Sequence, residues 1–87
     1  MAIEETSPSR LVSPPADAAV IKRSIAIAGH RTSVSLEEAF WRELKSLAKR
    51  QGRSVSALVA AVDADRRTAN LSSAIRVFIL QALAERQ

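Results

Sequence analysis

Three polar residues alternate along a short segment and have the chemistry to bond to nucleobase edges. Arg31, Ser33 and Ser35 alternate with apolar Val34 and Leu36. In an extended strand this spacing puts the polar side chains on one face and the apolar ones on the other. Arginine can bond bidentately to guanine, whereas serine can donate to or accept from several base edges. The segment is therefore a candidate base-reading strand, in which the two serines specify less than the arginine.

A second polar group stands where a helix is expected to begin. Ser54 is a predicted N-cap, and Arg53 precedes it. The first amides of a helix carry free N–H donors and partial positive charge, which favours phosphate. Lys49 and Arg50 lie one turn earlier. We expect this group to hold a phosphate backbone in register while the strand reads bases.

Charge is concentrated in the middle of the chain. Residues 22–53 carry eight bases against three acids, a net of +5, whereas residues 1–21 carry −2 and residues 54–87 carry +1. A basic block favours phosphate-bearing or acidic partners. Lys22 and Arg23 open this block, and we assign them to phosphate contact as well.

Several other functions find no support in the composition. The chain has no cysteine and one histidine, His30, so we predict no metal site and no cofactor. No His or Lys is arranged to activate a serine, so we predict that the chain is not an enzyme. The start, Met-Ala-Ile-Glu-Glu, is acidic where a secretory signal would be basic. We expect no membrane contact and a cytoplasmic, nucleoid-associated protein.

The chain divides into an arm and one domain. Residues 1–21 hold all three prolines and show no periodicity, so we predict a disordered arm that can contact a protein partner. Residues 22–87 form the domain. Within 24–36 the apolar positions switch from odd to even across Gly29, which requires a tight turn or a bulge. We expect a short arm at 24–28 and a separate strand at 31–36, and their pairing stays open.

Three helices follow the strand. The first is predicted at 37–51, where Ser35 to Glu38 has the form of a capping box that competes with base reading for the Ser35 hydroxyl. The second is predicted to begin at Ser54, and its apolar pattern ends over residues 63–67. The third is predicted at 72–85, with Asn70 or Ser72 as its cap.

Two observations predict a homodimer. A six-residue strand is too short to form a sheet alone, so we expect two copies to pair about a twofold axis. Helix 72–85 is apolar around most of its circumference and needs burial on more than one side. The residues predicted to form the core of the dimer are Val34, Leu36, Phe40, Trp41, Leu44, Leu47, Leu58, Val59 and Val62.

The order of strand, helix, Gly52-Arg53-Ser54 and helix over residues 30–66 resembles the ribbon-helix-helix (Arc/MetJ/CopG-like) family of bacterial DNA-binding proteins. The wider stretch 22–83 looks like a proteobacterial subfamily of short ribbon-helix-helix proteins. The resemblance implies an intertwined homodimer, mainly α with a short β-ribbon, here with an extra C-terminal helix. It places base reading on Arg31, Ser33 and Ser35, and phosphate binding at Ser54 and Val55.

The expected function is therefore a dimeric, sequence-specific regulator of transcription, a repressor, that binds double-stranded DNA and can form higher oligomers on it. Two alternatives stay open. One is an antitoxin with the same fold, whose 1–21 arm wraps a toxin. The other is a protein-interaction module whose basic face docks an acidic partner.

Overall fold

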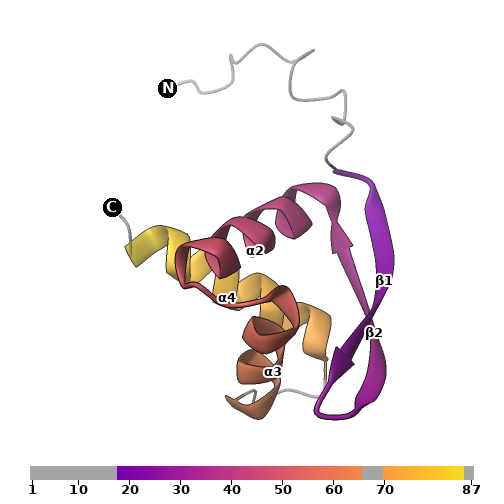
Figure 1. The fold of residues 1–87 in the computed structure, drawn as a ribbon. Helices are drawn as coiled ribbons and strands as arrows, with labels where there is room; N and C mark the ends of the chain where they lie inside the picture. The colour runs from indigo at the N-terminus through magenta and orange to yellow at the C-terminus, as the bar shows by residue number, and fades with distance from the viewer. Residues whose placement is uncertain (1–17, 66–69, 86–87) are drawn as a thin grey trace, which may run out of the picture.

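The computed structural model describes residues 18–65 and 70–85. Two strands come first, β1 (Val20–Ile27) and β2 (His30–Glu37). Three helices follow, namely α2 (Glu38–Arg50), α3 (Val55–Asp65) and α4 (Leu71–Glu85). The hairpin of β1 and β2 stands along one side, and the helices pack against one of its faces (Figure 1). The predicted fold, mainly α with a short β-ribbon and an added C-terminal helix, is confirmed.

The two strands are joined by a turn of two residues. Ala28 and Gly29 have φ values of 49° and 88°. Two positive φ values are the signature of a type I′ turn, whose twist matches that of the paired strands. The antiparallel register places Ile27 opposite His30 and Val20 opposite Glu37. Of the two alternatives at Gly29, the tight turn is therefore the one present.

The strand predicted at 31–36 pairs with a strand of the same chain, β1. The short arm expected at 24–28 is the second half of a longer strand, because residues 20–27 form one continuous strand paired along all of β2. The break at Gly29 lies where it was expected, and the pairing that the sequence left open is a hairpin. The strand also begins two residues before the predicted domain boundary at residue 22. The intertwined homodimer stays a prediction. Residues 1–17, which make up most of the predicted arm, lie outside the described residues.

Helix ends follow local signals in most cases. The Ser54 hydroxyl accepts a hydrogen bond from the Ala57 amide at 3.0 Å, as predicted for an N-cap. The Asn70 side chain caps α4 in the same way, through the Ser73 amide at 3.0 Å. At the end of α2, Gly52 takes a φ of 68°, and the Arg53 amide bonds back to the Ala48 carbonyl.

The predicted capping box at the start of α2 does not form. The N-cap residue is Glu37, and no side chain makes a capping hydrogen bond there. Strand β2 runs on to Glu37, so Ser35 lies in the ribbon and not at the helix start.

The core lies between the hairpin and the helices. Ile25, Ile27, Val34 and Leu36 are buried on the hairpin side, so the switch of apolar parity across the turn brings both strands to one face. The residues predicted for the dimer core are all buried within this one chain, apart from half-buried Phe40. In the part of the chain that the structure describes, no helix is long and apolar enough to cross a membrane.

Candidate nucleic-acid interface

The hairpin presents one face away from the helices, which we call the outer face. Its residues are Lys22, Ser24 and Ala26 of β1 with Arg31, Ser33 and Ser35 of β2. All are exposed except Ser35, which is half-buried. The structure thus brings the three predicted base-reading residues onto one surface, and it adds three residues of β1 that were not predicted to read bases.

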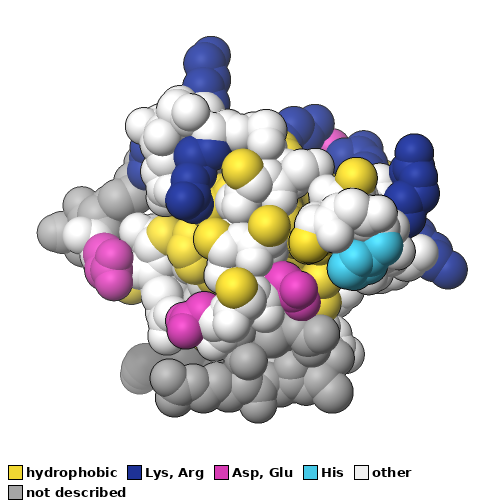
Figure 2. All heavy atoms as spheres, turned by 60° about the horizontal axis from the view of Figure 1, so that its bottom comes forward, with side chains coloured by type: hydrophobic (Ala, Val, Ile, Leu, Met, Phe, Trp, Pro, Cys, Tyr) yellow, Lys and Arg dark blue, Asp and Glu magenta, His cyan; other side chains and the backbone are white. Residues whose placement is uncertain are grey.

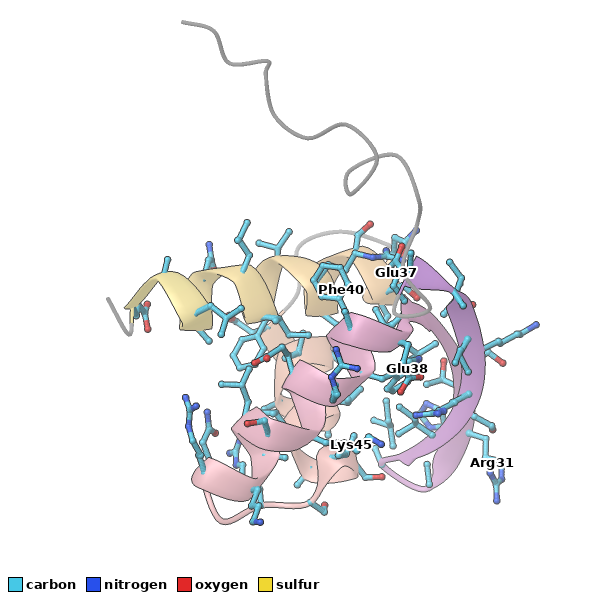
Figure 3. The ribbon with its side chains drawn as sticks, turned by 90° about the horizontal axis from the view of Figure 1, so that it is seen from above. Arg31, Glu37, Glu38, Phe40 and Lys45 are labelled. Carbon is cyan, nitrogen blue, oxygen red and sulfur yellow. The ribbon has the colours of Figure 1, made fainter. Side chains whose placement is uncertain are left out.

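Arg31 is the most prominent residue of the outer face. Figure 3 shows its side chain pointing outward from the hairpin, away from the helices. Its Nη1 donates a hydrogen bond to the Ser24 hydroxyl of the neighbouring strand at 3.3 Å. Ala26 lies directly opposite Arg31, and its small side chain leaves the guanidinium room. The guanidinium is therefore accessible and also oriented from within the chain.

Ser35 is less available because the N-terminal turns of α4 lie against it. Its amide donates to the Ser72 hydroxyl at 3.1 Å, and Arg76 Nη2 donates to its carbonyl at 3.2 Å. Arg76 also donates through Nε to Glu37 at 3.0 Å and lies 5.8 Å from the centre of the Phe40 ring. Figure 3 shows Glu37 and Phe40 beside α4. Helix α4 is therefore attached to the end of β2 by its own side chains.

The guanidinium of Arg76 also affects the ionisation of Glu37. Its hydrogen bond to the carboxylate lowers the pKa of Glu37, and a backbone hydrogen bond acts in the same direction. Glu37 is thus held as a carboxylate at the junction of β2 and α2.

Arg23 lies on the opposite face of the hairpin from the outer face. Its guanidinium is 5.0 Å from the centre of the Trp41 ring, and its Nη2 is 3.8 Å from a Glu38 carboxylate oxygen. Trp41 is buried and donates from Nε1 to the Ile21 carbonyl at 2.9 Å. These contacts join β1 to α2. The predicted contact of Arg23 with phosphate stays a prediction.

The start of α3 lies beside β1. A groove of about 310 Å³ separates them, lined by Ser24 and Ala26 of β1, Lys45 of α2, and Val55 and Ser56 of α3. The start of α3 therefore lies across this groove from an edge of the ribbon. The predicted binding of phosphate by its amides stays a prediction. Lys45 was not predicted as a contact. Its position four residues after Trp41 is the only sequence signal that puts it on the same side of α2.

The other residues predicted to contact phosphate lie in the last turn of α2 or just after it. Lys49, Arg50, Arg53 and Ser54 all face solvent. Figure 2 shows basic side chains along the upper and right parts of the view, with His30 among them, and acidic side chains mostly in the lower part. On the face seen in Figure 2, basic and acidic side chains thus lie mostly in different parts.

Helix α4 leaves part of its apolar surface uncovered. Ile75 and Ile79 are buried, whereas Val77 and Leu80 are 52% and 65% exposed. Beside this stripe, a groove of about 710 Å³ between α3 and α4 is lined by Leu58, Val62, Val77 and Phe78 among other residues. Cover of α4 on a second side stays a prediction, because Val77 and Leu80 are exposed in the chain that the structure describes.

Comparison with known proteins adds an independent finding. The model of a family described as a ribbon-helix-helix domain matches residues 20–83. Among solved structures, an uncharacterized protein from Bordetella pertussis Tohama I is similar, with 29% sequence identity and a TM-score of 0.71. The match covers 87% of this chain and 66% of that chain, so this chain spans slightly less than two thirds of that protein's length. A search of curated proteins found no match.

Proposed function

The chain belongs to the ribbon-helix-helix domain family, and we propose that it is a sequence-specific regulator of transcription, a repressor, that binds double-stranded DNA as a homodimer. Members of this family are usually DNA-binding regulators or antitoxins. The observation that carries the proposal is the outer face, where an exposed guanidinium, a lysine and serine hydroxyls lie on a two-stranded ribbon. A ribbon of this kind fits the DNA major groove.

In this proposal the two kinds of contact come from different elements. Arg31 bonds to guanine, and Ser33 bonds to a neighbouring base edge. The start of α3, and Lys45 across the groove from β1, hold the phosphate backbone along the ribbon. Exposed Arg53, which directly precedes the N-cap of α3, adds a further phosphate contact. Phosphate contacts fix the register, and base contacts supply the specificity.

The homodimer is supported by the apolar surface of α4. An exposed stripe that includes Val77 and Leu80, beside a groove of mixed apolar and polar lining, is typical of a surface that another chain covers. We propose that two copies cover it for each other, and that the protein acts in the cytoplasm on the nucleoid.

The experiment is in vitro selection of bound duplexes with the purified protein, followed by titration of the selected duplex at several salt concentrations. Arg31→Ala is expected to weaken binding to the selected duplex by about 1–3 kcal/mol and to relax preference at one position. Arg53→Ala is expected to weaken all duplexes about equally and to reduce the salt slope by about 1.

The outcomes separate the proposal from its rivals. If Arg31→Ala left the affinity for the selected duplex unchanged, the outer face would not read bases. If the wild-type protein held duplex DNA only at very low salt, the basic surface would instead serve an acidic protein partner.

A further inference from the structure

The contact that orients Arg31 comes from the neighbouring strand of its own hairpin. Nη1 of Arg31 donates to the Ser24 hydroxyl at 3.3 Å, and both residues are exposed on the outer face. An arginine has five N–H donors, and this bond uses one of them. The guanidinium therefore keeps enough donors for the two parallel bonds that it can make to guanine.

The register of the hairpin explains why Ser24 makes this contact. Ala26 lies directly opposite Arg31 and Ser24 lies opposite Ser33, so Ser24 is a diagonal neighbour of Arg31. Diagonal neighbours on one face of a sheet are within reach of long side chains. Ala26 has no polar side-chain atom, so it cannot accept this bond in place of Ser24.

A hydroxyl suits this task because it does not neutralise the guanidinium. The outer face has no carboxylate among its residues, which are Lys22, Ser24, Ala26, Arg31, Ser33 and Ser35. A carboxylate would bind the guanidinium more strongly and would compete with guanine for the same donors. The Ser24 hydroxyl instead sets the direction of the side chain and leaves its charge for DNA.

A second copy of the chain leaves this contact in place. Alternation of the ladder from the Ile27–His30 pair directs the backbone groups of Arg31 and Ser33 away from β1. A ribbon shared between two chains would pair along that free edge of β2, whereas Ser24 belongs to the strand on the other side of β2. Each Arg31 of a homodimer thus keeps the Ser24 of its own chain.

We infer that Ser24 is a positioning residue for base recognition, which holds the Arg31 guanidinium in the direction that it needs to meet a guanine. This inference rests on the proposed DNA binding. An exposed arginine samples many rotamers, and fixing it at an interface costs free energy. A guanidinium already held by Ser24 loses less of this freedom, so Ser24 strengthens binding through Arg31 without a DNA contact of its own.

The first test removes the hydroxyl. Ser24→Ala is expected to weaken binding to the selected duplex about three- to tenfold and to reduce the preference for guanine at the position that Arg31→Ala relaxes. The salt slope is expected to stay as in the wild-type protein, because no phosphate contact is lost. Ser24→Thr keeps the hydroxyl and is expected to retain both affinity and preference. A Ser24→Ala protein with the wild-type preference for guanine would overturn the inference.

A double-mutant cycle separates positioning from direct contact. In an Arg31→Ala background, Ser24→Ala is expected to have no further effect, because the residue through which it acts is gone. Ser33→Ala is the matched control on the opposite strand, since it removes a proposed base contact and is expected to cause the same loss in both backgrounds. Equal losses from Ser24→Ala in both backgrounds would show a direct contact with DNA and would contradict the positioning role.

Nuclear magnetic resonance measures the same role in the free protein. The order parameter of the Arg31 Nε–H bond reports how tightly the guanidinium is held. It is expected to fall in Ser24→Ala and to keep its wild-type value in Ser24→Thr and in Ser33→Ala. An unchanged order parameter in Ser24→Ala would sink the inference.

Failure of this inference differs from failure of the proposed function. If the wild-type protein selected no duplex, the proposed function would fall and this inference with it. If the wild-type protein selected a duplex that Arg31→Ala bound more weakly but Ser24→Ala did not, only the role of Ser24 would fall.

Discussion

Arg76 connects three parts of the molecule through one side chain. It donates to the Glu37 carboxylate and to the Ser35 carbonyl, and it lies over the Phe40 ring. Both hydrogen bonds span about forty residues of sequence. Charge-assisted bonds of this kind are stronger than neutral ones, so Arg76 is central to the docking of α4.

The Glu37–Arg76 pair predicts a dependence of stability on pH. The pKa of Glu37 is lowered in the folded chain, so Glu37 binds fewer protons there than in the unfolded chain. Its stabilising contribution is therefore present at neutral pH and is lost as the pH falls below the ordinary carboxyl range and through the lowered value. Urea unfolding at pH 7 and pH 3 is expected to show a smaller difference in stability for Glu37→Gln than for the wild-type chain.

The partner residue supplies the control. Arg76→Gln should flatten the pH dependence in the same way, because the carboxylate then lacks the guanidinium that lowers its pKa. A Glu37→Gln chain that kept the full wild-type difference between pH 7 and pH 3 would contradict this assignment.

Residues that act through their neighbours in sequence could be predicted, and those that act across the fold could not. Ser54 caps α3 through an amide three residues away, and its role is legible in the Gly-Arg-Ser pattern. Arg76 drew no prediction, because nothing local indicates that its partners lie on β2. The Ser35 capping box failed for the same reason. The pattern was present, but pairing with β1 kept Ser35 in the strand.

At the scale of elements, the turn between the strands contains a residue in an unfavourable conformation. Ala28 has a φ of 49°, which side chains other than those of Asn and Asp rarely adopt. Gly29 follows at a φ of 88° and supplies the second left-handed position without strain. Gly29 therefore suits the backbone conformation of its position in the turn, whereas Ala28 does not.

Replacing Ala28 by Asn is expected to stabilise the protein by about 0.5–1 kcal/mol, because Asn-Gly is the preferred pair for a type I′ turn. The midpoint of urea unfolding would rise with an unchanged slope. Ala26→Asn is the matched control, since Ala26 is also exposed but lies in the strand. A gain of the same size at residue 26 would show that the turn is not the cause.

The helices were easier to predict than the first strand. Apolar spacing placed all three helices close to their observed ends, with a correctly predicted cap at α3 and at α4, whereas β1 was recognised only in its second half. Arg23 interrupts the apolar row of Ile21, Ile25 and Ile27, and its place on the inner face depends on Trp41 and Glu38, which lie in another element. A strand whose pattern is completed by a distant helix cannot be read from its own residues.

At the scale of the whole molecule, part of the apolar surface of α4 is not covered by the described residues of its own chain. Val77 and Leu80 remain exposed, although Ile75 and Ile79 of the same helix are buried. Burying a leucine fully contributes about 1.5–3 kcal/mol.

Leu80→Glu is therefore expected to weaken self-association by about ten- to a hundredfold, measured by sedimentation equilibrium. Val20→Glu is the control, because Val20 is 59% exposed but lies at the start of the hairpin. Unchanged association of Leu80→Glu would remove α4 from the proposed dimer contact.

The short turn at Ala28 and Gly29 also affects how quickly a newly made chain forms its hairpin. A hairpin closed by two residues forms within about 1–10 μs in a unimolecular step. Its rate does not depend on how many other copies are present, unlike that of a ribbon assembled from two molecules. Since both strands precede the helices in the chain, they can begin to pair during synthesis, and the helices that follow then stabilise a hairpin that is only marginally stable alone.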